Sequence, residues 1–310
     1  MALHITSKTK RIPAWVFGPN HQVIFYGSPG SSLKNAIENA INEWSEETST
    51  PKEDFQLFHT TFHPATTYDH FVRTEKTFTR HNSTMVECIS KVFMKAYDAA
   101  RQKDTPVILV IEDIHRGNVP KIFGDFYTLL DRVNGESEYS IELNDQPRIT
   151  TYHSLPNNFF IWATMTTGEE ALFTMDHSFQ RKWHWKYVPI NYAAEPNTSF
   201  CIGDKKYQWN DFLKAINHTI LEYTHSEEKQ MGENFRFKIN STIDFKNEIM
   251  GYLWHSICKD NYGTERNFFR YYFGEDNNST REFSFRQLFT PEGDDILENF
   301  LDFIGCPART

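Results

Sequence analysis

QVIFYGSPGSSLK, residues 22–34, sets the fold class of this 310-residue chain. The apolar run over 22–26 predicts a strand, and the Gly-Ser-Pro-Gly that follows predicts a tight loop. After the loop, apolar residues recur at spacings of three and four from Leu33 to Trp44, which predicts a helix. A strand, a glycine-rich loop and a helix in this order are typical of α/β proteins that hold phosphate groups in the loop.

The alternation of strands and helices continues along the chain. Residues 106–111, PVILVI, and 158–163, NFFIWA, are continuous apolar runs, as expected of strands buried on both faces of a parallel sheet. Apolar residues over 83–101 follow a helical spacing and predict a helix. Beyond residue 190 the strand signals fade and helical patterns dominate. We therefore predict a doubly wound α/β core over 1–190 and a smaller, helical lid-like domain over 191–310.

Composition argues against several classes of protein. The chain carries 32 Lys and Arg against 41 Asp and Glu, a net charge of −9, which gives no electrostatic footprint for nucleic-acid binding. Its four cysteines are widely spaced, which predicts free thiols in a reducing compartment. No apolar run approaches the ~18 residues of a membrane span, and the N-terminal residues lack the apolar centre of a signal peptide. We therefore predict a cytoplasmic protein.

The loop departs from the phosphate-binding pattern. That pattern, G-x-x-x-x-G-K-[ST], uses its lysine to neutralise phosphates and its hydroxyl to hold Mg²⁺. Here Ser32 replaces the second glycine, Leu33 the lysine and Lys34 the hydroxyl. Either a slip of one residue brings Lys34 to the phosphates, or the loop keeps its turn without its chemistry. If a nucleotide is bound, the expected contacts are Gly27, Ser28, Pro29, Gly30, Ser31, Ser32, Leu33 and Lys34.

The acidic pair that ends the second apolar run is also altered. In P-loop ATPases this strand ends in an aspartate near Mg²⁺ and a glutamate on the attacking water. Here the order is Glu112 and then Asp113. Asp113 is shorter than a glutamate by about 1.5 Å, and a misplacement on that scale costs roughly 100-fold in rate. Glu112 remains the candidate metal ligand.

Several segments resemble the McrB family, the AAA+ GTPases of modification-dependent restriction. Residues 115–124, HRGNVPKIFG, are similar to that family's Asn-Arg-Gly-Asn-x-x-Lys-Ile-Phe-Gly. Residues 61–72 and 158–167 are similar to its Phe-His-x-Ser-Tyr-x-Tyr-Glu-Asp-Phe segment and its sensor strand. Residues 175–183 resemble the segment that supplies trans-acting arginines. The resemblance covers roughly residues 20–260 and implies an AAA+ P-loop-type core with a helical lid.

Compared with this family, the chain also differs at three further catalytic or signature positions. The sensor asparagine falls on Thr166, and the signature asparagine falls on His115. The run of three arginines falls on Gln180, Arg181 and Lys182. No catalytic residue is therefore expected, and Glu112, Asp113 and Thr166 are read as degenerate positions. The resemblance implies subunit contacts at Arg116, Asn118, Arg181 and Lys182.

These departures favour a catalytically degenerate AAA+ module that acts as a non-hydrolysing structural or regulatory subunit of a larger assembly. One alternative is a weak ATP- or GTP-hydrolysing motor in DNA restriction that uses Lys34 and Glu112. Another is an inhibitor that inserts into active McrB-like rings. The family implies protein partners in an AAA+ homo- or hetero-oligomer, nucleic acid only indirectly, and no membrane. No cofactor is expected unless the site is retained, in which case it would take Mg-ATP or Mg-GTP.

Overall fold

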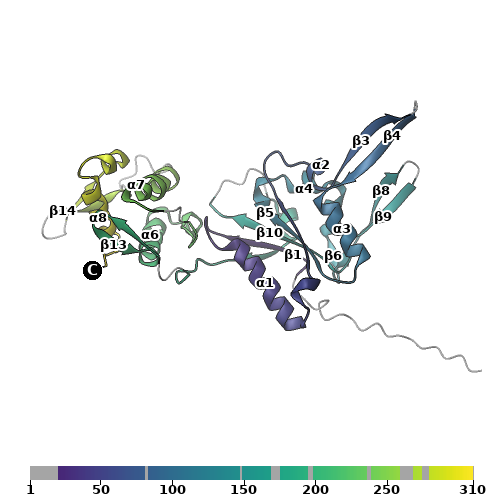
Figure 1. Ribbon diagram of the computed structural model, residues 1–310, viewed down its shortest axis with the longest axis horizontal. Helices are drawn as coiled ribbons and strands as arrows, with labels where there is room; N and C mark the ends of the chain where they lie inside the picture. The colour runs from purple at the N-terminus through teal and green to yellow at the C-terminus, as the bar shows by residue number, and fades with distance from the viewer. Residues whose placement is uncertain are drawn as a thin grey trace, which may run out of the picture. The chain divides into compact units, whose positions relative to one another are not determined.

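The chain folds into two compact units (Figure 1). The computed structural model describes residues 20–80, 83–146, 149–168, 175–194, 198–235, 239–258, 268–273 and 279–309. The first unit comprises Met1–Tyr26, Leu33–Met165 and Glu170–Lys186, and the second comprises Gly27–Ser32, Thr166–Glu169 and Tyr187–Thr310. Residues 1–19, to which the prediction about a signal peptide applies, lie outside the described part of the chain.

A five-stranded sheet forms the centre of the first unit. Its strands are β1 (Gln22–Gly27), β2 (Gln56–Thr61), β5 (Val107–Glu112), β10 (Phe159–Thr166) and β11 (His184–Tyr187), in the order β11-β1-β10-β5-β2. Both β10 and β2 pair with β5 in parallel. The α/β fold predicted from the apolar runs is therefore confirmed.

The sheet is covered by helices on both faces, which explains why its central strands are apolar throughout. On one face, Trp44 of α1 (Leu33–Thr48) packs edge-on against Phe160 and lies against Trp162. On the other face, the neighbouring β10 residues Phe159 and Ile161 belong to the main core. Adjacent residues of a strand point to opposite faces of the sheet. When both faces are covered, every residue of a central strand is therefore buried, and apolar residues are favoured throughout.

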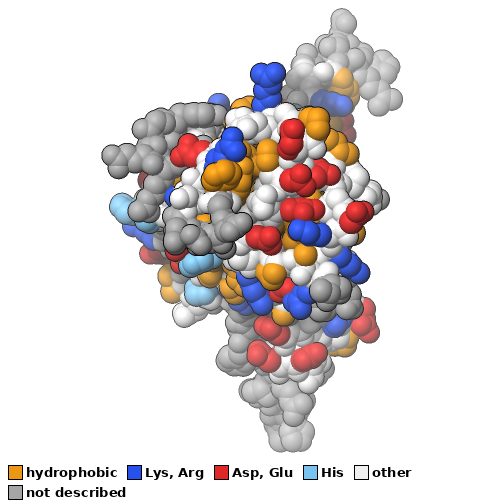
Figure 2. All heavy atoms as spheres, turned by 90° about the vertical axis from the view of Figure 1, so that its left-hand side faces the viewer, with side chains coloured by type: hydrophobic (Ala, Val, Ile, Leu, Met, Phe, Trp, Pro, Cys, Tyr) orange, Lys and Arg blue, Asp and Glu red, His pale blue; other side chains and the backbone are white. Residues whose placement is uncertain are grey.

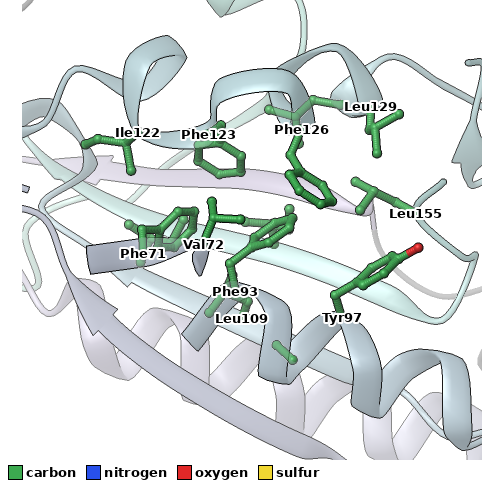
Figure 3. Close-up of a cluster of buried hydrophobic side chains, with 14 of the residues drawn as sticks. Phe71, Val72, Phe93, Tyr97, Leu109, Ile122, Phe123, Phe126, Leu129 and Leu155 are labelled. Carbon is green, nitrogen blue, oxygen red and sulfur yellow. The ribbon is translucent and has the colours of Figure 1, made fainter. Parts of the chain in front are cut away.

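The main core lies between the sheet and the short helices of the first unit (Figure 3). In Figure 3, Phe93 and Tyr97 point from α3 (Val92–Gln102) toward Phe123 and Phe126. Phe123 ends α4 (Val119–Phe123), and Phe126 lies in a 3₁₀ segment, Gly124–Leu130. The remaining short helices are Lys52–Asp54, α2 (Tyr68–Phe71) and Ile114–Arg116.

The helix predicted over 83–101 is wrong in its first half. Residues Ser83–Ser90 form strand β4, which pairs antiparallel with β3 (Arg73–Arg80), and the helix α3 begins only at Val92. This hairpin and a second one, β8 (Ile141–Gln146) with β9 (Ile149–His153), project from the first unit in Figure 1. A two-residue pairing joins β6 (Arg132–Val133) to β7 (Glu136–Ser137).

The second unit has its own core, built on the helix α6 (Trp209–Thr224). The other helical segments are Glu227–Lys229, α7 (Thr242–Asp244), the π-helical turns Phe245–Met250 and Leu253–Ile257, the 3₁₀ helix Phe285–Phe289 and α8 (Gly293–Phe303). Two antiparallel hairpins were not predicted: β12 (Ser199–Ile202) with β13 (Lys205–Gln208), and β14 (Arg270–Phe273) with β15 (Ser279–Glu282).

One face of the molecule mixes charges of both signs. Figure 2 draws one face, on which acidic, basic and apolar side chains are interspersed. On this face the basic side chains are spread among acidic ones and form no continuous track. Among the described residues, every helix is too short or too polar to span a bilayer.

Candidate nucleotide site

Two of the predicted site residues meet in the first unit. Lys34 lies in the first turn of α1, and its Nζ atom is 3.0 Å from Oε1 of Glu112, the last residue of β5. The lysine side chain is 72% exposed and the glutamate 26%, so the pair lies at the edge of the sheet. The other carboxylate oxygen of Glu112 lies 3.5 Å from the hydroxyl of Thr61. The structure therefore brings together the two residues on which the weak-motor hypothesis depends.

Leu33, at the position of the expected lysine, has a different environment. It begins α1, and its side chain is 8% exposed. An apolar side chain in this place contributes packing and has no charge to offer a phosphate. The lysine of this loop is the next residue, Lys34, and its side chain extends toward Glu112.

Two further altered positions, Asp113 and Thr166, lie at the ends of strands. Asp113 follows β5 in the left-handed region, with φ of 53°, and its N–H donates to Thr164 Oγ1 at 3.2 Å. A non-glycine residue in this region is strained and is held there by its surroundings. Thr166 is the last residue of β10.

The glycine-rich loop Gly27–Ser32 belongs to the second unit, where a distant segment lies along it. The N–H of Gly232 donates to the carbonyl of Pro29 at 2.7 Å, and the N–H of Asn234 donates to the carbonyl of Gly30 at 2.9 Å. Between them, the Glu233 carboxylate accepts a hydrogen bond from the N–H of Ser32 at 3.2 Å. Glu233 is 1% exposed. Sequence reasoning missed this residue, because no spacing links it to a loop about 200 positions earlier.

As they stand, these residues do not fit a nucleotide phosphate. Phosphate loops bind anions through backbone N–H groups. Here the Ser31 N–H donates to the Ser28 carbonyl at 3.0 Å within the loop, and the Ser32 N–H is taken by Glu233. The part of the loop that would hold a phosphate is occupied by the chain itself.

The residues after β5 that resemble the McrB family, 115–124, include two with clear structural roles. Asn118 caps α4, since its Oδ1 accepts a hydrogen bond from the N–H of Lys121 at 3.2 Å. A Cβ on Gly117 would lie 2.6 Å from Ile122 Cδ1 and 2.8 Å from Phe62 Cδ2, so a larger residue would require these side chains to move. Arg116, by contrast, is exposed. Of the two predicted contact residues here, Arg116 has the side chain that is available at the surface.

The predicted contact residues Arg181 and Lys182 also differ in exposure. The Lys182 ammonium forms an ion pair with Asp131, and its side chain is only 4% exposed. It also lies over the ring of Tyr127. Arg181 is exposed. Both residues line a cavity of about 470 Å³ in the first unit, together with His21 and Arg132.

A half-buried arginine, held by main-chain oxygens, lines the cavity. The guanidinium of Arg132 donates to the carbonyls of Gly135, Pro156 and Phe159 at 2.7, 3.1 and 2.9 Å. Burial lowers the pKa of Arg132 to about 9, which leaves it protonated at neutral pH. Burial, and then the Arg132 charge, lower the pKa of His21 to about 4.

Comparison with known proteins finds two relatives of the chain among components of restriction enzymes. No protein-family model matches the chain. It is 26% identical over 280 residues to the type II restriction enzyme BsuMI component YdiS of Bacillus subtilis, covering 78% of this chain and 80% of that protein. It is 22% identical over 145 residues to the type IV methyl-directed restriction enzyme EcoKMcrB subunit of Escherichia coli, covering 44% of this chain and 30% of that protein.

The chain is thus similar to the McrB-like AAA+ family. The resemblance drawn from residues 115–124 and the other segments is thus confirmed, and the parallel sheet described above agrees with the α/β fold that it implies. The degeneracy of the catalytic positions stays a prediction.

Solved structures add little to the family assignment. NtrX from Brucella abortus matches with a TM-score of 0.35 and 12% identity, over 68% of this chain and 38% of that one. A putative ATPase from Cytophaga hutchinsonii matches with a TM-score of 0.34 and 11% identity, over 96% and 81% of the two chains. Scores this low carry no argument about the McrB-like chain.

Proposed function

We propose that this McrB-like chain is a non-hydrolysing structural or regulatory subunit of a restriction assembly. The observation that carries the proposal is the environment of Leu33 and Lys34. Leu33 is buried at the position of the phosphate-binding lysine, and Lys34 is paired with Glu112. Losing a charge-assisted contact to phosphate costs about 1.5–3 kcal/mol in binding alone.

Two relatives support the setting of the proposal. They are named as a component and as a subunit of restriction enzymes, so each is one part of a larger enzyme. A chain of this family that binds nucleotide poorly would contribute by occupying a position in such an assembly. Arg116 and Arg181, both exposed, are the side chains we propose for contact with a neighbouring subunit.

A second candidate function, a weak ATP- or GTP-hydrolysing motor, is favoured by one specific observation. Lys34 and Glu112 lie 3.0 Å apart, so a cation and an acidic side chain stand together at the carboxyl end of β5. In parallel sheets, ligands bind at this end of the strands.

Calorimetric titration of the purified chain with ATP and with GTP, each with Mg²⁺, separates the two candidates. We expect no binding at millimolar nucleotide and no phosphate release, because Leu33 supplies no charge. Sub-millimolar binding that Lys34→Ala abolishes, and that the control Lys52→Ala leaves intact, would overturn our proposal in favour of the motor.

A further inference from the structure

Glu233 is a buried carboxylate held by main-chain N–H groups. One oxygen accepts from Ser32 N–H at 3.2 Å and the other from Asn191 N–H at 3.3 Å. Burying a carboxylate is costly unless its charge is satisfied by hydrogen bonds. The Ser32 N–H lies in the loop that, in P-loop proteins, accepts phosphate through its N–H groups. The Glu233 carboxylate thus has the same kind of partner that a phosphate oxygen would have.

The backbone of the segment 231–235 fits the loop closely. A Cβ on Gly30, whose φ is +82°, would lie 2.6 Å from the Cβ of Phe235. A Cβ on Gly232 would overlap the nitrogen of Ser31 and the carbonyl of Gly30. Glycine at these two positions allows the two backbones to approach. Asn234 adds a side-chain hydrogen bond to Ser32 Oγ at 2.7 Å.

The helix α6 anchors the same segment from behind. Asn217, 1% exposed, accepts a hydrogen bond from the N–H of Met231 at 2.7 Å and donates one to its carbonyl at 2.8 Å. Trp209 Nε1 donates to the carbonyl of Glu233 at 3.2 Å. The helix therefore holds the segment at Met231 and at the main chain of Glu233.

We propose that residues 231–235 are an autoinhibitory strap, in which the Glu233 carboxylate occupies the loop in place of a phosphate and must leave before a phosphate-bearing ligand can enter. This inference deepens the proposed function and rests on it, because it gives a physical reason why the loop would not bind a nucleotide. Seating of the strap and binding of an anion in the loop are mutually exclusive. The apparent affinity of the loop for phosphate is then reduced by the fraction of molecules in which the strap is seated.

The test uses two variants that unseat the strap by different means. Gly232→Ala adds a methyl group where the strap meets Ser31, and Glu233→Ala removes the carboxylate. Controls are Gly251→Ala, whose Cβ would meet only atoms 3.9 and 4.0 Å away, and Glu222→Ala, whose side chain is 69% exposed. Hydrogen–deuterium exchange of residues 27–34 and calorimetric binding of pyrophosphate are measured for all five proteins.

We expect amide exchange in the loop to rise in both strap variants and pyrophosphate binding to tighten by about tenfold or more. Both controls should match the wild type. If Gly232→Ala lowers the yield of folded protein, Glu233→Ala decides the outcome. Unchanged exchange, or pyrophosphate affinity equal to that of the wild type, would overturn the strap. The proposed function fails separately, through nucleotide hydrolysis by the wild-type chain.

Discussion

His21 is a residue whose ionisation is coupled to the stability of the first unit. Its ring stacks on Phe160 with centroids 4.5 Å apart, and its Nε2 lies 2.7 Å from the carbonyl oxygen of Asn157. Burial, and then the charge of Arg132, lower its pKa from 6.5 to about 4. Between these values the unfolded chain binds a proton that the folded chain does not. Stability must therefore fall as the pH falls from about 6.5 toward 4.

Urea unfolding of the first unit at pH 7.5 and pH 5.0 measures this effect. We expect the free energy of unfolding of the wild type to be lower at pH 5.0 by up to about 2 kcal/mol because of His21, since one pKa unit corresponds to about 1.4 kcal/mol. His21→Phe keeps a ring against Phe160 and should remove that part of the pH dependence. His218→Phe, at a 71% exposed position, is the control. An equal pH dependence in His21→Phe and the wild type would contradict the assignment.

At the scale of elements, α4 depends on the residues that precede it. Asn118→Ala removes the cap on the Lys121 N–H and should destabilise the protein by about 1 kcal/mol. Gly117→Ala should cost more, because the new methyl group would collide with Ile122 and Phe62. Lys121→Ala, at an exposed position of the same helix, is the control and should change little. Thermal unfolding gives the order, and a Gly117→Ala protein as stable as Lys121→Ala would contradict it.

The sequence predicts those elements whose burial leaves a local pattern. β1, β5 and β10 are recognised because a strand covered on both faces is apolar throughout. The region 83–101 misleads because its apolar spacing suits a helix, whereas residues 83–90 pair with the strand just before them, as Met85 does with Phe78. The approach of Lys34 to Glu112 can also be anticipated from the sequence, because the helix that follows the glycine-rich loop begins near the end of a neighbouring strand. The position of Glu233 depends on tertiary contacts and has no local signature.

At the scale of the whole molecule, the chain has two separate hydrophobic cores. Phe126 belongs to the core of the first unit and Phe300 to that of the second, and both are fully buried. We expect two transitions in differential scanning calorimetry. Removing either ring should cost about 3–5 kcal/mol in its own unit, so Phe126→Ala should lower one transition and Phe300→Ala the other. A single transition lowered equally by both variants would contradict this expectation.

The burial of Leu33 has a consequence for how the loop could change over generations. A lysine at this position would place an ammonium group where an apolar side chain, 8% exposed, now packs. Leu33→Lys, the substitution that would supply the missing charge, would therefore give a less stable protein. The requirement to fold therefore favours an apolar residue at this position even in a loop that binds no ligand.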